Sequence, residues 1–513
     1  MNRPRVLLTT EGTYPFQRGG VSTWCHELTE SLSNVDFKIF AVIANPYLLQ
    51  QYKCAPNVTE VIKIPLWGVE DPLEFSWRIP FVRAVRSKNA TTKAVISQKF
   101  LPIFQEFLHG VVHDSHNTRR MGRLLVDLHD YFLQYDYNTT LNSALVWDSF
   151  QDIVLQPWQD RCRISDITVG EMTDALRFFQ RFMLTIHLPV PEVDLIHSSA
   201  ASFCGLPGVI GKIKYGLPYM LTEHGIIVRE NYLRLVQTID SLYVRLFLNK
   251  LVGAVVRLNY FFADIIAPVC AYNARWEKWW GVPANKIKVI YNGADPDIFK
   301  PVPRPAASHP IVMNMGLIFP LKGQLELIKA AAIVRDQVPN VEFQFYGKPS
   351  DANYYRDCQA AVTNFGLEKN INFAGYTSEP WRVYSTSDVV AMSSISEGFP
   401  YAVVEAMLSG GTIVATDVGG VGEALGETGM LVPAKQPPAL AEGILHMLNL
   451  PIEERDKYGT QARERAMRLF TKRLFSQTHI DTYHQLIRQV KIDMLTSQPA
   501  NQPMSLLAAG NRN

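Results

Sequence analysis

The sequence predicts an α/β protein of two doubly wound domains that face each other across a cleft, with a helical insertion in the first domain. Three observations predict this fold class. β-rich runs alternate with helical patterns in the second half, the first half begins in the same way, and a proline-rich segment separates the halves. Alternating strands and helices form parallel sheets with crossover helices, and two such sheets place a ligand cleft between their carboxyl ends.

The composition is that of a large globular chain. Its 513 residues are 47% hydrophobic and 19% charged, which provides for a sizeable core and excludes bulk disorder. The net charge of +2 excludes a nucleic-acid binder that works through overall positive charge. The cysteines form no C-x-x-C pair, which argues against a zinc ribbon and a disulfide-rich scaffold.

The first domain is expected to span residues 1–298. A helix at about 22–32 follows the first strand and its glycine loop, and between about 67 and 191 the alternation gives way to helical patterns. We interpret that stretch as a largely helical insertion. The expected strands of this domain are 6–10, 37–44, 195–199, 219–223 and 265–269.

The second domain is expected at 299–470, after a stiff proline segment at 301–305. A helix at 471–495 lies beyond its last βα unit and is expected to cross back to the first domain. The tail, 496–513, is rich in polar residues and is expected to be disordered. The expected strands are 311–316, 341–347, 371–376, 388–394, 412–418 and 430–433.

We expect a cytoplasmic protein, with a peripheral place at the inner face of the membrane left open. The apolar run at 6–10 is too short for a signal peptide. The longest apolar stretch, 242–269, carries Arg245, Lys250, Arg257 and Asp264, which argues against a simple membrane span.

The strongest chemical motif is Ser396-Glu397-Gly398-Phe399-Pro400-Tyr401, followed by Glu405 within the next helix. A carboxylate can hold paired hydroxyl groups of a ribose or sugar by accepting two hydrogen bonds. The backbone N–H groups at the helix start provide an edge for anions and hydroxyls. The alternative is an acidic residue near the positive end of a helix, but the whole string after a strand favours a site.

Other candidates follow strands or begin helices. Glycine pairs let a backbone approach a phosphate closely, although a plain turn would look the same. Lys322 could bind phosphate, or it could be a solvated helix-start lysine. Histidines and a glutamate at strand ends could reach the cleft, or they could be structural. These candidates are Gly19, Gly20, Gly419, Gly420, His224, Glu223 and His197.

No metal or cofactor is expected. Asp295-Pro296-Asp297 spells the D-x-D of metal-dependent transferases, but it follows Asn292-Gly293 near the linker and fits a turn and helix cap. No cluster of His, Cys and Asp has the spacing of metal ligands.

The chain resembles the family 4 retaining glycosyltransferases. Their signature is a glutamate, seven residues and a second glutamate, which Glu397 and Glu405 match. The glycine loop at 18–21, the 291–295 segment and the 316–323 loop fall in the family's order. The segments 11–24 and 221–226 are similar to those of the PelF-type exopolysaccharide subgroup, which also has an enlarged first domain.

The resemblance implies two Rossmann-like domains of the GT-B type. It implies a nucleotide-diphosphate sugar as donor, in this subgroup a UDP-sugar, a saccharide acceptor, and contact with a membrane-bound polysaccharide synthesis complex. His224 would contact the transferred sugar and Glu397 its hydroxyls, while Glu405 would hold the ribose and Lys322 the diphosphate. Gly316 opens the donor loop. Front-face attack by the acceptor hydroxyl would retain the anomeric configuration.

The chain departs from the family at Leu317, which occupies the position of an arginine in the donor loop. Leucine cannot bind phosphate, so another cation would be needed, with Arg18 as first choice and Lys348 or Arg229 as alternatives. Two other functions remain open. One is a UDP-sugar epimerase on the same fold, and the other is a non-catalytic sugar-nucleotide-binding subunit of a polysaccharide assembly.

Overall fold

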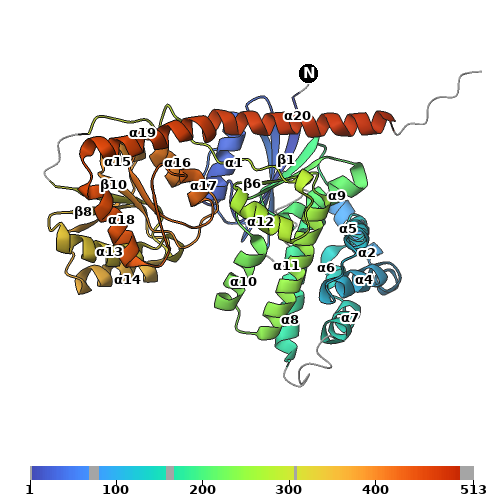
Figure 1. Cartoon of the computed structure of the whole chain (residues 1–513). Coiled ribbons are helices and arrows are strands. Elements are labelled where there is room, and N and C mark those ends of the chain that lie inside the picture. Colours follow the sequence, from blue (N-terminus) through green and yellow to red (C-terminus); the bar gives the residue numbers. More distant parts are fainter. Residues whose placement is uncertain (1–2, 69–79, 157–166, 305–308, 497–513) are drawn as a thin grey trace, which may run out of the picture.

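The computed structural model describes residues 3–68, 80–156, 167–304 and 309–496. The expected tail at 497–513, Pro305 of the linker, and parts of the insertion at 69–79 and 157–166 lie outside the described residues. Figure 1 shows two lobes, one built by the N-terminal part of the chain and one by the C-terminal part, with a long final helix running along the first lobe. The predicted fold class is confirmed.

The first lobe contains a parallel sheet that has six strands in the described residues, in the order β3-β2-β1-β4-β5-β6. Five of them were expected from the sequence, whereas β3, an edge strand with exposed Thr59 and Glu60, was not. The strands are β1 (Arg5–Glu11), β2 (Asp36–Ile43), β3 (Val58–Pro65), β4 (Leu195–Ser198), β5 (Tyr219–Glu223) and β6 (Ile265–Pro268).

This sheet is covered on both faces because its strands are apolar on both sides. On β1, Leu7 packs into one hydrophobic core, while Val6 and Leu8 pack into another on the opposite face. Outside the insertion, the helices that connect the strands of this lobe are α1 (Gly20–Ser31), α9 (Leu206–Tyr215), α10 (Ile227–Thr238) and α11 (Leu242–Phe262), and α12 (Ala271–Trp279) follows the last strand.

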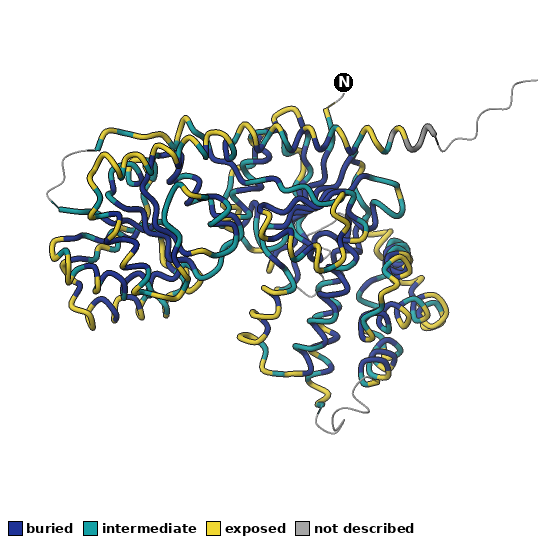
Figure 2. The backbone as a smooth tube through the Cα atoms, in the orientation of Figure 1, coloured by how far each residue is buried: buried dark blue, intermediate teal, exposed yellow. Residues whose placement is uncertain are grey.

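The insertion between β3 and β4 is helical and shares a core with the sheet. Phe104 and Phe150 of the insertion are fully buried in the same cluster as Leu7 of β1. Figure 2 shows buried residues both in the sheet and along the inner sides of the insertion helices. The insertion helices are α2 (Phe81–Ala90), α3 (Lys93–Val95), α4 (Leu101–Val112), α5 (Thr118–Phe132), α6 (Tyr137–Leu141), α7 (Ala144–Leu155) and α8 (Val169–Phe182), with a π-helical turn at Ile96–Phe100.

The second lobe repeats the strand order of the first. Its parallel sheet, again six-stranded within the described residues, runs β12-β11-β10-β7-β8-β9. The strands are β7 (Ile311–Met315), β8 (Glu342–Tyr346), β9 (Ile371–Gly375), β10 (Val389–Met392), β11 (Ile413–Thr416) and β12 (Met430–Val432). The helices are α13 (Gln324–Gln337), α14 (Ala352–Asn364), α15 (Pro380–Thr386), α16 (Tyr401–Leu408), α17 (Val421–Leu425), α18 (Pro437–Asn449) and α19 (Ile452–Leu469).

The chain passes between the lobes at 291–300 and returns near Thr471, and these two crossings lie side by side. The Ala294 N–H donates to the Phe470 carbonyl at 3.0 Å, and the Lys472 N–H donates to the Ala294 carbonyl at 2.9 Å. The final helix, α20 (Lys472–Thr496), then packs on α1, with Phe475 and Tyr483 buried in a core of the first sheet. The two crossings therefore form the connection about which the lobes could move.

Among the described residues, we find no helix that combines the length and the apolar character needed to span a bilayer.

Candidate active site

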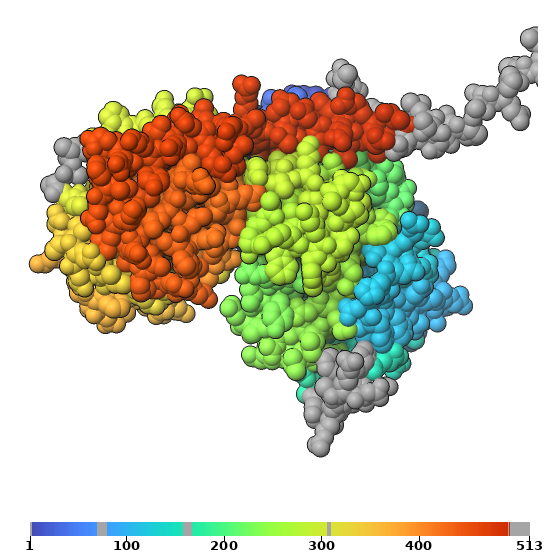
Figure 3. Space-filling model, in the orientation of Figure 1, coloured from blue at the N-terminus to red at the C-terminus, as the bar shows by residue number. Residues whose placement is uncertain are grey.

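A cavity of about 490 Å³ lies between the two lobes, at the carboxyl ends of both sheets. Figure 3 shows a groove between the lobes on one face of the molecule. Doubly wound sheets bind ligands at this edge because their loops and helix N-termini converge there. The cavity is lined by Glu11, Thr13, Gly20, Val21, Ser199, Ala200, Ser202, His224, Gly225, Ile227, Glu230, Val269 and Asn292 of the first lobe and by Lys322, Glu397, Gly398, Phe399, Pro400, Tyr401 and Ala402 of the second.

The second lobe contributes an ion pair to this cavity. Lys322, at the end of a 3-10 turn (Pro320–Lys322), places Nζ 2.6 Å from Oε1 of Glu397, which follows β10. The Ser394 hydroxyl donates to the same carboxylate oxygen at 2.6 Å. Gly316 lies beside the aliphatic chain of Lys322. The structure thus brings these three sequence-predicted residues together.

Arg229, and not Arg18, is the alternative cation that touches the motif loop. Its Nη1 donates to the Ser396 hydroxyl at 3.3 Å, across the two lobes. Arg18 is exposed and does not line the cavity, and Lys348 lies over the Tyr376 ring. Leu317 is 42% exposed, so an arginine introduced there would not enter the core.

His224 comes from the end of β5 and lines the cavity from the first lobe. Its ring packs on Trp24 with centroids 4.8 Å apart. Burial lowers the pKa of His224 to about 3, so the imidazole is neutral at physiological pH. Within the described chain, buried Nε2 of His224 has no hydrogen-bond partner, so this polar atom is left unpaired.

The structure does not bring His197 and Glu223 to the cavity, which corrects the expectation that they face the cleft. His197 is fully buried, with Nδ1 2.7 Å from the Tyr483 hydroxyl and Nε2 2.8 Å from the Thr222 hydroxyl. Glu223 is also fully buried and accepts a bond from the Tyr260 hydroxyl at 2.6 Å. Burial raises the pKa of Glu223 well above its ordinary value. Both residues tie the sheet to its covering helices.

The glycine pairs have different surroundings. A Cβ at Gly19 or Gly20 would meet no heavy atom within 4 Å, so this loop has room for a ligand. Gly420 instead donates its N–H to the Gly398 carbonyl at 2.7 Å, and a Cβ at Gly419 would collide with the Glu397 carbonyl. The candidate role of the Gly419-Gly420 backbone in phosphate binding is therefore corrected at Gly420, because its N–H is already used to pack the motif loop.

Gly398 also sets how closely the lobes approach. A Cβ at this position would collide with the carbonyl oxygen of His224 in the other lobe. The side-chain amide of Asn292 donates to the neighbouring Phe399 carbonyl at 2.9 Å. The motif loop is therefore held against the first lobe as well as against its own sheet.

Glu405 is half-buried on α16 and does not line the cavity. The Tyr384 hydroxyl donates to its Oε2 at 3.2 Å. Burial raises the pKa of Glu405 to about 7.

Sequence reasoning missed two acidic residues at the contact between the lobes. Glu11 ends β1 and lines the cavity, and its position directly after the first expected strand could have identified it. Glu423 accepts bonds from the N–H groups of Ala271 and Tyr272 and from the Tyr291 hydroxyl, so it clamps the second lobe onto the start of α12. No local pattern predicts that clamp.

Asp295 and Asp297 form a turn, as the sequence indicates, with the Asp297 N–H donating to Asp295 Oδ1 at 2.9 Å.

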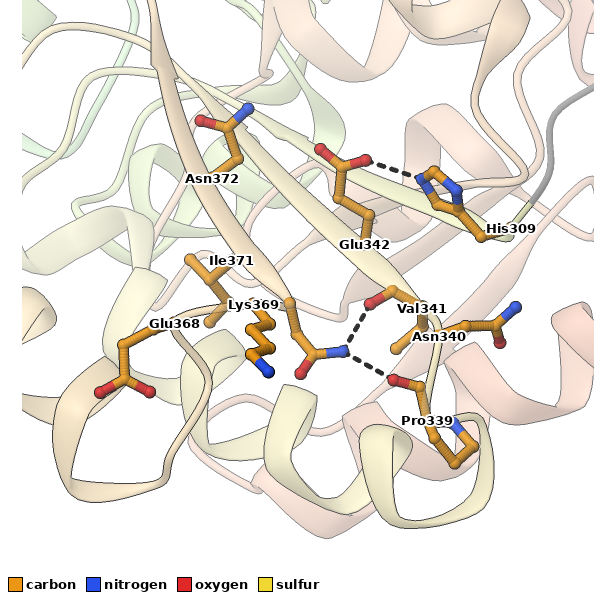
Figure 4. Close-up of a pocket in the computed structure, with 10 residues that line it drawn as sticks. His309, Pro339, Asn340, Val341, Glu342, Glu368, Lys369, Ile371 and Asn372 are labelled. Carbon is orange, nitrogen blue, oxygen red and sulfur yellow. Dashed lines mark hydrogen bonds and ion pairs between the residues drawn. The ribbon is translucent and has the colours of Figure 1, made fainter.

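A larger cavity, of about 680 Å³, lies at the opposite edge of the second sheet (Figure 4). It surrounds the first residues of β8 and β9, where Glu342 accepts from His309 at 2.8 Å. This cavity lies at the amino edge of the sheet, and none of the sequence-predicted site residues lines it. We therefore assign the candidate active site to the inter-lobe cavity.

The facing sheets, with a site at their carboxyl edges, define a GT-B fold, the fold of nucleotide-sugar glycosyltransferases. Residues 4–285 match the family model described as Domain of unknown function (DUF3492), and the chain belongs to that family. Residues 297–465 match the model of Glycosyl transferases group 1.

The curated relatives are similar over part of their length. D-inositol 3-phosphate glycosyltransferase of Corynebacterium glutamicum (strain R) is 32% identical over 200 residues, which are 36% of this chain and 48% of the relative. The same-named protein of Rhodococcus opacus (strain B4) is 31% identical over 189 residues, 34% of this chain and 42% of the relative. The chain therefore spans less than half the length of these two relatives.

Solved structures are similar over nearly the whole chain. Sucrose-phosphate synthase from Thermosynechococcus elongatus has a TM-score of 0.60 at 17% identity and covers 95% of this chain and 100% of its own. HepE of Anabaena in complex with UDP has a TM-score of 0.56 at 15% identity and covers 94% and 100%. At these identities the likeness shows the fold.

Proposed function

We propose that this chain is a retaining, metal-independent glycosyltransferase that moves a sugar from a UDP-sugar to a saccharide acceptor. The observation that carries the proposal is the convergence of Lys322 and Glu397 of one lobe with His224 of the other on a single cavity. The group 1 match over 297–465 and the UDP-bound HepE structure of the same fold support it.

In this proposal the diphosphate of the donor replaces Glu397 as the partner of Lys322. The ammonium would then stabilise the negative charge that develops on the leaving group, while the released carboxylate accepts hydrogen bonds from sugar hydroxyls. Arg229 would add a second cation near the same loop and so compensate for Leu317. Both positive groups would bind more strongly as charge grows in the transition state.

His224 would contact the transferred sugar from the first lobe. A neutral imidazole can both donate and accept one hydrogen bond, which suits a sugar hydroxyl and does not repel the positive charge that develops at the anomeric carbon. Attack by the acceptor hydroxyl on the same face as the leaving group would retain the anomeric configuration. Glu405 would hold the ribose.

A finer set of assignments also belongs to this proposal. These are the PelF-type subgroup, a role in exopolysaccharide synthesis, a cytoplasmic location and contact with a membrane-bound synthesis complex. The similarity of the 11–24 and 221–226 segments to that subgroup supports them.

The deciding experiment incubates the purified protein with UDP-glucose, UDP-galactose and UDP-N-acetylglucosamine, with and without saccharides, and follows UDP release. A transferase releases UDP and forms a product whose anomeric configuration NMR can read. An altered sugar without UDP release would indicate an epimerase. Neither reaction, together with tight UDP binding, would indicate a non-catalytic binding subunit.

A further inference from the structure

A second cavity, of about 310 Å³, adjoins the inter-lobe cavity within the first lobe. The two cavities share Glu11, Ser202, Ile227 and Glu230 as lining residues. The second one extends from there between α8 of the insertion, α10 and α11. A molecule bound in it would therefore lie next to the candidate active site.

One wall of this cavity is a stack of phenyl rings. Phe178 and Phe182 lie one turn apart on α8, with ring centroids 6.0 Å apart and planes inclined by 21°. Phe182 stacks in turn on Phe203, with centroids 4.6 Å apart and planes inclined by 14°. The insertion thus supplies part of an apolar wall beside the active site, and Phe178 and Phe182 are themselves half-buried.

Polar groups of both charges complete the lining. The Arg234 guanidinium donates to the Asn231 side-chain oxygen at 3.1 Å, and Asn231 is 7% exposed. Glu11 accepts the Cys204 N–H at 3.1 Å. Burial raises the pKa of Glu11, while Arg234 opposes that rise. An anionic ligand would meet Glu11 and Glu230, and an alkyl chain would leave these polar groups unpaired.

We propose that this cavity is an acceptor subsite that binds one neutral pyranose residue. The apolar face of the sugar would lie against the apolar wall to which Phe178 and Phe182 contribute, while its hydroxyls would bond to Asn231, Arg234 and Glu11. The volume falls at the lower end of the range for small-ligand pockets, which suits a single sugar unit. This inference rests on the proposed function, because it names the substrate that would attack the donor in the adjoining cavity.

Glu11 lies at the junction of the two cavities, where the hydroxyl of a bound sugar would enter the active site. The subsite would therefore orient the acceptor by its far side and present one hydroxyl to the donor. The insertion, which supplies two of the phenyl rings, would set which saccharide the protein accepts.

The test titrates four neutral probes, the methyl α-glycosides of glucose, galactose and mannose and N-acetylglucosamine, into the full chain. Saturation-transfer NMR and calorimetry would follow binding with and without UDP. We expect at least one probe to bind, with a dissociation constant raised at least fivefold by Phe182→Ala and by Arg234→Ala. Arg177→Ala, on the same helix α8 but exposed and paired with Asp174, should leave it unchanged.

Two outcomes would overturn the subsite. They are the absence of binding by all four probes, and binding that neither variant alters. Arg234 is exposed, so Arg234→Ala should fold even if Phe182→Ala does not. UDP affinity should be the same in wild type and all three variants. If UDP does not bind at all, the proposed function fails, whereas the titration without UDP still decides the subsite.

Discussion

The two lobes have the same strand order, but the polar groups that they place at the cavity differ in whether they already have a hydrogen-bond partner. In the second lobe the polar groups are already paired, since Glu397 Oε1 accepts hydrogen bonds from both Lys322 Nζ and the Ser394 hydroxyl. In the first lobe, within the described residues, buried His224 Nε2 has no partner, and burial raises the pKa of Glu11. The difference teaches that the lysine of the second lobe is already paired with a carboxylate that an anionic group could replace, whereas the first lobe presents an unpaired imidazole nitrogen.

The largest effect expected from this comparison is that of Lys322→Ala. We expect turnover in the UDP-release assay to fall by about 10²–10³, the usual cost of losing one group that stabilises transition-state charge. Lys348→Ala, which removes a lysine from a neighbouring loop, is the matched control and should retain activity. Wild-type turnover by the Lys322 variant would show that the ion pair is structural.

The next effect tests the contact between the lobes. Gly398→Ala would push a methyl group into the His224 carbonyl, so the lobes would have to separate. We expect about 10²-fold slower UDP release, because small misplacements of catalytic groups are costly, and a larger radius of gyration in X-ray scattering. Gly170→Ala, at the start of α8 with no close contact, should change neither quantity. Unchanged scattering and rate in the Gly398 variant would contradict the close approach.

A smaller effect distinguishes Arg229 from Arg18 as the residue that supplies the positive charge missing at Leu317. Arg229→Ala should weaken UDP binding by roughly tenfold, or about 1.4 kcal/mol, because a charge-assisted contact is lost. Arg18→Ala should leave UDP affinity unchanged, since in the described residues Arg18, unlike Arg229, makes no hydrogen bond to the motif loop. Calorimetric titration measures both, and the reverse order of effects would restore Arg18 as the compensating residue.

The smallest effect concerns pH and Glu405. Its folded pKa of about 7 lies above its ordinary value, so the neutral carboxyl is favoured by folding. The stabilisation is complete below the unfolded pKa, near 4.5, and is lost as pH rises through about 7. Glu405→Gln should therefore flatten the fall in unfolding free energy between pH 6 and 8 by about 1 kcal/mol. Identical denaturation profiles for variant and wild type across that range would contradict the burial of this carboxyl.

The sequence predicted the second lobe better than the first for a physical reason. Lys322 and Glu397 follow strands within one short βα unit each, so local spacing places them at the carboxyl edge. His197 also belongs to a strand, but its partner Tyr483 comes 286 positions later on α20, and no local pattern indicates which helix covers that strand. Likewise, the Gly419-Gly420 pair was recognisable as a turn, but its use in packing against Gly398 depends on a separate segment.

The central claim is that Lys322, which pairs with Glu397 in this structure, exchanges that partner for the diphosphate of a bound donor. The most direct measurement titrates UDP and uridine into wild type and Lys322→Ala by calorimetry, because the two ligands differ in the diphosphate alone. We predict that wild type binds UDP at least tenfold more tightly than uridine, and that the variant loses most of this preference while its uridine affinity stays the same. An equal preference for UDP in both proteins would contradict the claim.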